Sequence, residues 1–374
     1  MHTKKREPFI HIVKRADLPG WKAWLIRGIA VLAAFLVSGL VCLMLTKGKY
    51  FISFYAEMFD GAFGTERRIL NLFQYWAMLL CVSLAVTPAF KMKFWNIGAE
   101  GQTLMGSFAS AIVIWYLGGK IPEGALIVLM LAASIVAGAI WAVIPAIFKA
   151  FFNTNETLFT LMMNYLASHL VLFTIDQWVT NGSRVVGILN HGSFANAFGK
   201  LYVINAVIVT VLTVLTFVYL RFSKHGYELD VVGESVNTAK YVGINVKKVI
   251  IRTMILSGVL CGIAGFLLVG GSNTPTINGS LVDGRGFTAI LVSWLAQFNP
   301  IIMAFVAFLV IFMQRGSAQA ASKFQIAGAD AFNGVIVGIF FLLVIASEFF
   351  VRYRVVLKTK KFKTKQEKAV KGVK

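Results

Sequence analysis

Long runs of apolar residues, separated by short polar segments, dominate this chain of 374 residues. A helix needs about 20 consecutive, mostly apolar residues to cross a membrane, and runs of this kind predict ten spans. The expected spans lie near residues 25–46, 69–90, 102–118, 124–148, 157–175, 201–220, 251–272, 287–298, 300–314 and 327–350. The eighth and ninth are short and meet at Asn299-Pro300, so they are either two half-helices or one kinked span.

Basic residues concentrate at the two ends of the chain and in one internal connection, 221–252. With ten spans, 26 of the 36 Lys and Arg residues lie on the side of both termini and 10 on the opposite side. Cytoplasmic segments of membrane proteins carry such an excess, so we expect both termini in the cytoplasm. The chain then divides into a basic N-terminal segment (1–24), a transmembrane domain (25–350) with a cytoplasmic arm (221–252), and a basic tail (351–374).

The composition excludes several other classes of protein. The chain is 58% apolar and 14% charged, whereas soluble domains have about 25% charged residues. Although the net charge is +20, the basic clusters flank apolar spans, which indicates contact with membrane lipid and no nucleic-acid partner. Neither a catalytic residue nor a metal site is predicted, because no triad, carboxylate pair or Cys/His cluster stands out and the three cysteines lack metal-ligand spacing.

Two polar, glycine-containing breaks interrupt the apolar runs, one at Trp95–Gln102 and one at Asp283–Gly286. Irregular backbone at membrane depth is tolerated only inside protein or beside a watery cavity. The breaks occupy matching positions in two sets of five spans, and paired breaks of this kind point to a transport site. We therefore expect an all-α integral membrane protein with about ten transmembrane helices in two inverted five-helix halves with broken helices. The alternative is that both breaks are simple loops with glycine turns.

Polar and aromatic side chains beside the breaks are the candidates for the substrate pathway. These residues are Trp95, Asn96, Glu100, Gln102 and Phe287. Asn96 and Gln102 offer neutral donors and acceptors for a solute, and Trp95 either stacks on it or anchors the chain at the membrane interface. We expect Glu100 to brace the break by accepting hydrogen bonds from the freed backbone N–H groups of a helix N-terminus; the alternative is that it binds solute hydroxyls. This lining lacks a basic cluster, which favours uncharged solutes over nucleotides.

A second pair of polar residues, Glu156 and Asn164, lies in the fifth span. The two are eight positions apart and therefore share roughly one face of a helix. They fall near the end of that span which is predicted to be cytoplasmic. We expect them to act in gating or in contact between subunits.

The cytoplasmic arm contains the signals of a short helix. Glu234 and Ser235 suit a helix start and Gly243 suits a stop. Between these signals, Val236, Ala239 and Val242 recur every third residue, with Lys240 beside them. A helix this short is not stable alone in water. We therefore expect the arm to dock on a partner protein. The alternative is a solvated loop that packs on its own membrane domain.

Four segments of the chain resemble the permease subunits of ABC importers for nucleosides and simple sugars. Residues 95–108 are similar to the NIGAEGQ-type signature, and 153–165 to the Asn-Glu block that is followed by Leu-Asn-Tyr. Residues 239–246 are similar to the family's coupling segment, and 286–300 to its fourth shared block. The four segments occur in the family's order, and residues 153–165 are most similar to the nucleoside branch.

The resemblance implies a multi-pass permease subunit in a bacterial cell (inner or plasma) membrane. Such a subunit forms the solute pathway with a second permease, homologous or identical, and receives its solute from an extracytoplasmic solute-binding protein. ATP and Mg would bind to a separate ABC ATPase that docks on the arm residues Glu234, Val236, Ala239, Lys240, Val242 and Gly243. This chain has no phosphate loop of its own, so we expect neither a bound cofactor nor enzymatic activity. Two alternatives stay open: an importer of the same type for simple sugars or another neutral small solute, and a secondary transporter, which would not need the arm.

Overall fold

The computed structural model describes residues 10–15, 18–179, 182, 185–193, 202–272, 275–326 and 328–357. The chain divides into two compact units, both mostly helical. The first unit combines the two ends of the chain, Met1–Glu57 and Ala320–Lys374, and the second is Met58–Gln319. One boundary falls inside helix α2 (Phe51–Phe63) and the other inside helix α12 (Pro300–Lys323), so these two helices contribute residues to both units.

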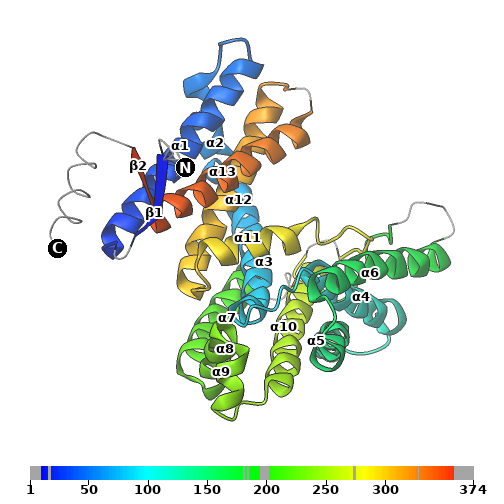
Figure 1. Cartoon of the computed structure of the whole chain (residues 1–374). Helices are drawn as coiled ribbons and strands as arrows, with labels where there is room; N and C mark the ends of the chain where they lie inside the picture. Colours follow the sequence, from blue (N-terminus) through cyan, green and yellow to red (C-terminus); the bar gives the residue numbers. More distant parts are fainter. Residues whose placement is uncertain are drawn as a thin grey trace, which may run out of the picture. The chain divides into compact units, whose positions relative to one another are not determined.

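The second unit contains most of the helices (Figure 1). They are α3 (Glu66–Lys91), α4 (Ala99–Leu117), α5 (Glu123–Phe152), α6 (Glu156–Trp178), α7 (Val203–Phe222), α8 (Lys224–Glu234), α9 (Val236–Tyr241), α10 (Val246–Gly270) and α11 (Arg285–Leu295). Helix α10 lies at the centre, because it packs against α3, α4 and α5. Helices α4, α5 and α6 lie side by side, and α7, α8 and α9 follow one another closely.

Small residues allow α10 to approach its neighbours closely. A Cβ atom on Gly258 would lie 2.4 Å from the carbonyl oxygen of Gly138 in α5, and one on Gly106 in α4 would lie 2.8 Å from the Cα atom of Gly262. Both distances are shorter than any real Cβ contact, so glycine is required at these positions. Small residues serve the same purpose in membrane helix pairs, where packing rather than hydrophobicity holds the helices together.

The first unit pairs α1 (Gly20–Leu45) with α13 (Ala329–Arg352). The guanidinium group of Arg27 lies 3.1 Å from the Glu348 carboxylate, which also lies 3.2 Å from Arg352. Beyond these helices, β1 (Ile10–Lys14) and β2 (Tyr353–Leu357) form a two-stranded antiparallel sheet in which Ile12 faces Val355. The sheet therefore joins the segment before α1 to the segment after α13 (Figure 1).

Each of the ten predicted spans coincides with one helix of the structure. Eight of the described helices are long and apolar enough to cross a membrane, namely α1, α3, α5, α6, α7, α10, α12 and α13. The predicted third and eighth spans, α4 and α11, fall outside this set, and α11 has only 11 residues. The prediction of about ten crossings in two inverted halves stays a prediction. The sequence analysis predicted neither the two strands nor α2 and α8, which are short elements outside the long apolar runs.

Candidate functional site

The first break lies between α3 and α4, where two buried amide side chains pair with each other. Asn96 Nδ2 donates to Gln102 Oε1 at 3.2 Å, and Gln102 Nε2 donates to Asn96 Oδ1 at 3.2 Å. Asn96 also bonds Ser257 Oγ of α10 at 3.2 Å and accepts a bond from the Gly98 backbone at 3.0 Å. Both amide groups are thus committed to bonds within the protein, and they stabilise the irregular backbone.

Helix α6 holds the same break from a second direction. Asn164 Oδ1 accepts from the Gly101 backbone N–H at 2.9 Å, and Asn164 Nδ2 donates to the Ile97 carbonyl at 3.0 Å. Thr160 Oγ1 accepts from the Ile97 N–H at 3.2 Å. The structure therefore brings Asn164 to the polar break, where the sequence analysis had not placed it. The other residue of the predicted gating pair, Glu156, instead forms an ion pair with Lys149 at 2.8 Å.

The carboxylate of Glu100 connects the first break to the second. Its Oε1 accepts from the Gly284 N–H at 2.8 Å and its Oε2 from the Gly286 N–H at 2.7 Å. These amides belong to the start of α11, where helical N–H groups have no partner within the helix and a negative charge is favoured. The sequence analysis expected Glu100 to accept bonds from a helix N-terminus but did not identify which one, and the donors are 184 and 186 residues away.

Aromatic side chains next to the two breaks remain exposed on the second unit. Trp95 is 43% exposed and Phe287 is 44% exposed. The Trp95 ring lies 5.7 Å from the ring of Trp294, which is the exposed residue two helical turns after Phe287. Of the five predicted pathway residues, Trp95 and Phe287 therefore present a free surface. Asn96 and Gln102 are buried, and Glu100 connects the two breaks.

The arm is built from two capped helices. Ser223 Oγ accepts from the Gly226 N–H at 3.0 Å at the start of α8, and Ser235 Oγ accepts from the Thr238 N–H at 3.3 Å at the start of α9. The second cap confirms the helix start that the sequence predicted. The helix ends at Tyr241, and Gly243 then takes a φ of +82°, which favours glycine.

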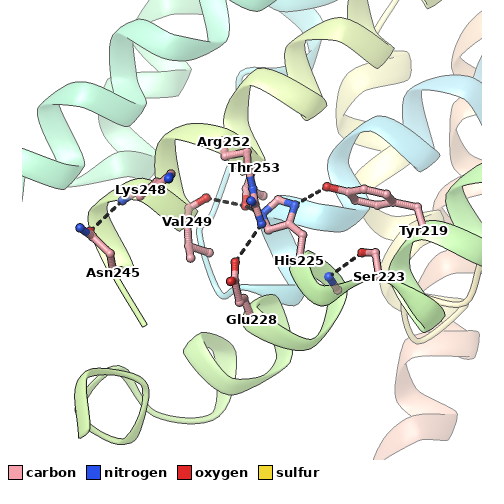
Figure 2. Close-up of polar contacts among 10 residues, drawn as sticks. Tyr219, Ser223, His225, Glu228, Asn245, Lys248, Val249, Arg252 and Thr253 are labelled. Carbon is pink, nitrogen blue, oxygen red and sulfur yellow. Dashed lines mark hydrogen bonds and ion pairs between the residues drawn. The ribbon is translucent and has the colours of Figure 1, made fainter. Parts of the chain in front are cut away.

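A buried histidine connects the base of the arm to two membrane helices, as Figure 2 shows. His225 of α8 bonds the Tyr219 hydroxyl of α7 through Nδ1 and contacts Thr253 Oγ1 of α10 at 3.2 Å through Nε2. An ion pair between Arg252 and Glu228 at 2.8 Å lies beside it. Burial, and to a lesser extent the Arg252 charge, lower the pKa of His225 to about 4. Neutral His225 therefore links three helices at neutral pH.

The residues of the predicted apolar face of the arm differ in their burial. Ala239 is fully buried and packs among Leu229, Val232 and Val249. Val242 is 61% exposed, and Val236 is also exposed. Ala239 therefore faces its own chain and is not part of an exposed docking face, while docking through Val236 and Val242 stays a prediction. Tyr241 is 92% exposed, and the sequence analysis did not select it.

A groove of about 570 Å³ lies between the arm and the ends of α3, α5 and α10. Its walls include Glu156 from the predicted gating pair and Glu234, Val236 and Lys240 from the predicted coupling set. The structure thus places residues that were predicted for two separate roles at one groove. In the part of the chain that the structure describes, no three His, Cys, Asp or Glu side chains come together as a metal site would require.

Comparison with known proteins gives several relatives that match most of the chain. The chain is 26% identical to the glucose ABC transporter permease protein TsgB13 of Haloferax volcanii, over 91% of this chain and 92% of that protein. It is 28% identical to the guanosine ABC transporter permease protein NupP of Bacillus subtilis, over 68% and 74% of the two chains. It is 27% identical to the nucleoside ABC transporter permease protein NupB of Lactococcus lactis, over 77% and 82%.

A family profile covers both breaks, the arm and the groove. The profile describes the permease component of the branched-chain amino acid transport system and matches residues 68–345. The matched region contains every residue that the sequence analysis selected for the pathway, for gating and for coupling. This chain therefore belongs to the family of permease components of branched-chain amino acid type ABC transport systems.

Proposed function

We propose that this permease component carries nucleosides into the cell as one of two permease subunits of an ATP-driven importer. The observation that carries the proposal is the Glu100 clamp, the two bonds by which this carboxylate joins the broken segments, each of which carries an exposed aromatic residue. Broken helices that meet at one point are the usual construction of a solute site in transporters. Two relatives named for guanosine and nucleosides support the solute class, and a glucose relative keeps simple sugars as the alternative.

The surface formed by Trp95, Phe287 and Trp294 is the proposed wall of the solute pathway. An aromatic surface suits a nucleoside, because every base has a flat face that stacks on an aromatic ring. The opposite wall would come from the second permease, since these side chains are exposed on their own unit. Asn96 and Gln102 would act behind the wall by holding the break in shape.

The arm is the proposed contact with the ABC ATPase, on the cytoplasmic side with both chain termini. Its exposed residues Val236, Tyr241 and Val242 offer the outer contact. Buried Ala239 and His225 connect the arm to the membrane helices. Helix α10 then reaches the break through the bond between Ser257 and Asn96. A movement of the arm after ATP binding would therefore reach the pathway through one continuous set of contacts.

Uptake by the reconstituted importer tests the proposal. The chain would be co-expressed with its second permease, ATPase and solute-binding protein, and uptake of labelled inosine, uridine, ribose and glucose measured with and without ATP. We expect ATP-dependent uptake of nucleosides, and none when the ATP-binding lysine of the ATPase is replaced. Uptake of glucose or ribose without any nucleoside uptake would overturn the proposal in favour of the sugar alternative.

A further inference from the structure

Two arginines from different helices converge on one tyrosine in the second unit. The guanidinium carbon of Arg315, in α12, lies 3.2 Å from the centre of the Tyr75 ring, and that of Arg285, in α11, lies 5.3 Å from it. Tyr75 itself belongs to α3. All three side chains are half-buried. The sequence analysis found no basic cluster because the arginines are 30 positions apart.

The hydrogen-bonding groups of this pair are largely unused. The Nε atom of Arg315 is buried without a hydrogen-bond partner, and within the described part of the chain Arg315 makes no ion pair. Among the described residues, Arg285 donates hydrogen bonds only to the carbonyls of Leu281 and Val282, at 3.4 and 3.3 Å. An arginine inside a membrane domain is costly and generally marks a functional site. A guanidinium group that contacts an aromatic ring keeps its N–H donors at its edge, where a ligand can accept from them.

The charged groups near Arg285 limit the charge of the ligand that this cluster would accept. Glu100 and Asp283 both interact electrostatically with Arg285. With these two carboxylates near Arg285, the cluster favours a neutral ligand rich in acceptors over a phosphate. Arginine has only donors, and its two-pronged geometry matches the adjacent O6 and N7 acceptors of a 6-oxopurine.

We infer that Tyr75, Arg285 and Arg315 form a subsite for the base of a 6-oxopurine nucleoside such as inosine or guanosine. The inference rests on the proposed nucleoside function and specifies its solute class. Adenosine presents an amino group in place of O6, which would leave arginine donors facing a donor. Uridine lacks the paired acceptors altogether. The subsite therefore predicts a preference among nucleosides, which the aromatic wall alone would not give.

Maximal uptake rates of the complete importer test this subsite. The solute-binding protein would be supplied already saturated with labelled inosine, adenosine or uridine, so that its capture step does not decide the result. Arg315→Lys keeps the charge but loses the two-pronged geometry, and Arg315→Gln removes the charge. Lys323→Gln, an exposed change in the same helix, is the matched control. Thermal unfolding of each variant detects simple loss of the fold.

We expect wild type and Lys323→Gln to carry inosine faster than adenosine or uridine. In Arg315→Lys, inosine uptake should fall about tenfold, as for loss of one two-pronged contact, with the other two solutes little changed. The subsite would be overturned if Arg315→Lys lost uptake of all three solutes equally, or if it kept the wild-type preference for inosine. Preferred uptake of inosine monophosphate would also overturn it. Uptake of sugars without any nucleoside would instead overturn the proposed function on which the subsite rests.

Discussion

Glu100, in the first turn of α4, accepts a hydrogen bond of 2.7 Å from the backbone N–H of Gly286, in the first turn of α11. The two residues are 186 positions apart, and each lies beside a different break. The bond places two helix starts against one carboxylate, so the charge of Glu100 satisfies donors that no helical carbonyl reaches.

Replacing Glu100 with Gln should weaken this clamp. Glutamine has one acceptor oxygen instead of two and no charge, so one backbone N–H of α11 loses its partner, at a cost of about 1–3 kcal/mol. We expect a lower melting temperature and a lower maximal uptake rate together, with the apparent affinity unchanged. The matched control is Glu66→Gln, an exposed carboxylate in the first turn of α3. A variant that keeps its stability but carries a different solute would show that Glu100 contacts the solute directly.

Replacing Gly286 with Ala tests the clamp from the other side. A Cβ atom at this position would lie 2.5 Å from the Glu100 nitrogen, so the helix starts must separate, at about 1–3 kcal/mol for overpacking. Thermal unfolding and uptake should both decline. Gly338→Ala in α13 meets nothing within 4 Å and should leave both unchanged or slightly raise stability. If Gly286→Ala and Gly338→Ala had the same stability and the same uptake, the close approach of Gly286 to Glu100 would be contradicted.

Two substitutions in the arm separate the partner contact from the core. Val242→Asp alters an exposed residue, so the permease should insert and fold normally, while the ATPase no longer co-purifies and uptake is lost. Ala239→Asp places an unpaired charge in a buried cluster, so the permease itself should be destabilised. If Val242→Asp keeps both co-purification and uptake, the ATPase contacts another surface.

The buried His225 predicts a dependence of stability on pH. Its pKa is about 4 in the folded protein, below the value of about 6.5 in an unfolded chain, so folding requires the neutral form. The stabilisation is complete above pH 6.5 and is lost as the pH falls from there towards 4. The groups around it are Tyr219, Glu228, Arg252 and Thr253.

Hydrogen exchange of α8 and α9 at pH 7.5 and pH 5 would measure this effect, after correction for the intrinsic dependence of exchange on pH. Wild type should show less protection at pH 5, whereas His225→Gln should show the same protection at both pH values. His169→Gln, which changes a histidine in a different helix, serves as the control. Weaker protection at pH 5 in His225→Gln as well would assign the effect to another group.

The long helices could be predicted from the sequence, because a long apolar run in a membrane protein has few alternatives to a membrane-spanning helix. Helix α8 escaped prediction because its apolar residues are few, and its position depends on contacts of His225 and Leu229 with other helices. Residues inside one break could be selected for their polarity and glycine content. Their partners could not, since Asn164 and Gly284 lie 63 and 184 positions from the residues they bind.

Residue type also failed to separate buried from exposed positions near the breaks. Asn96 and Gln102 are polar and yet buried, because they satisfy each other. Phe287 is apolar and yet exposed, because it lies on the outer face of a short helix. These outcomes depend on which helix lies behind each residue, which the local pattern does not contain.

The ladder between β1 and β2 constrains the topology independently of the charge distribution. Ile12 and Val355 are directly paired strand residues, one before the first helix and one after the last. Because these two strands are hydrogen-bonded to each other, we expect the segments before α1 and after α13 to lie on the same side of the bilayer. The number of crossings would then be even, and reporters fused beside either strand would label a single compartment.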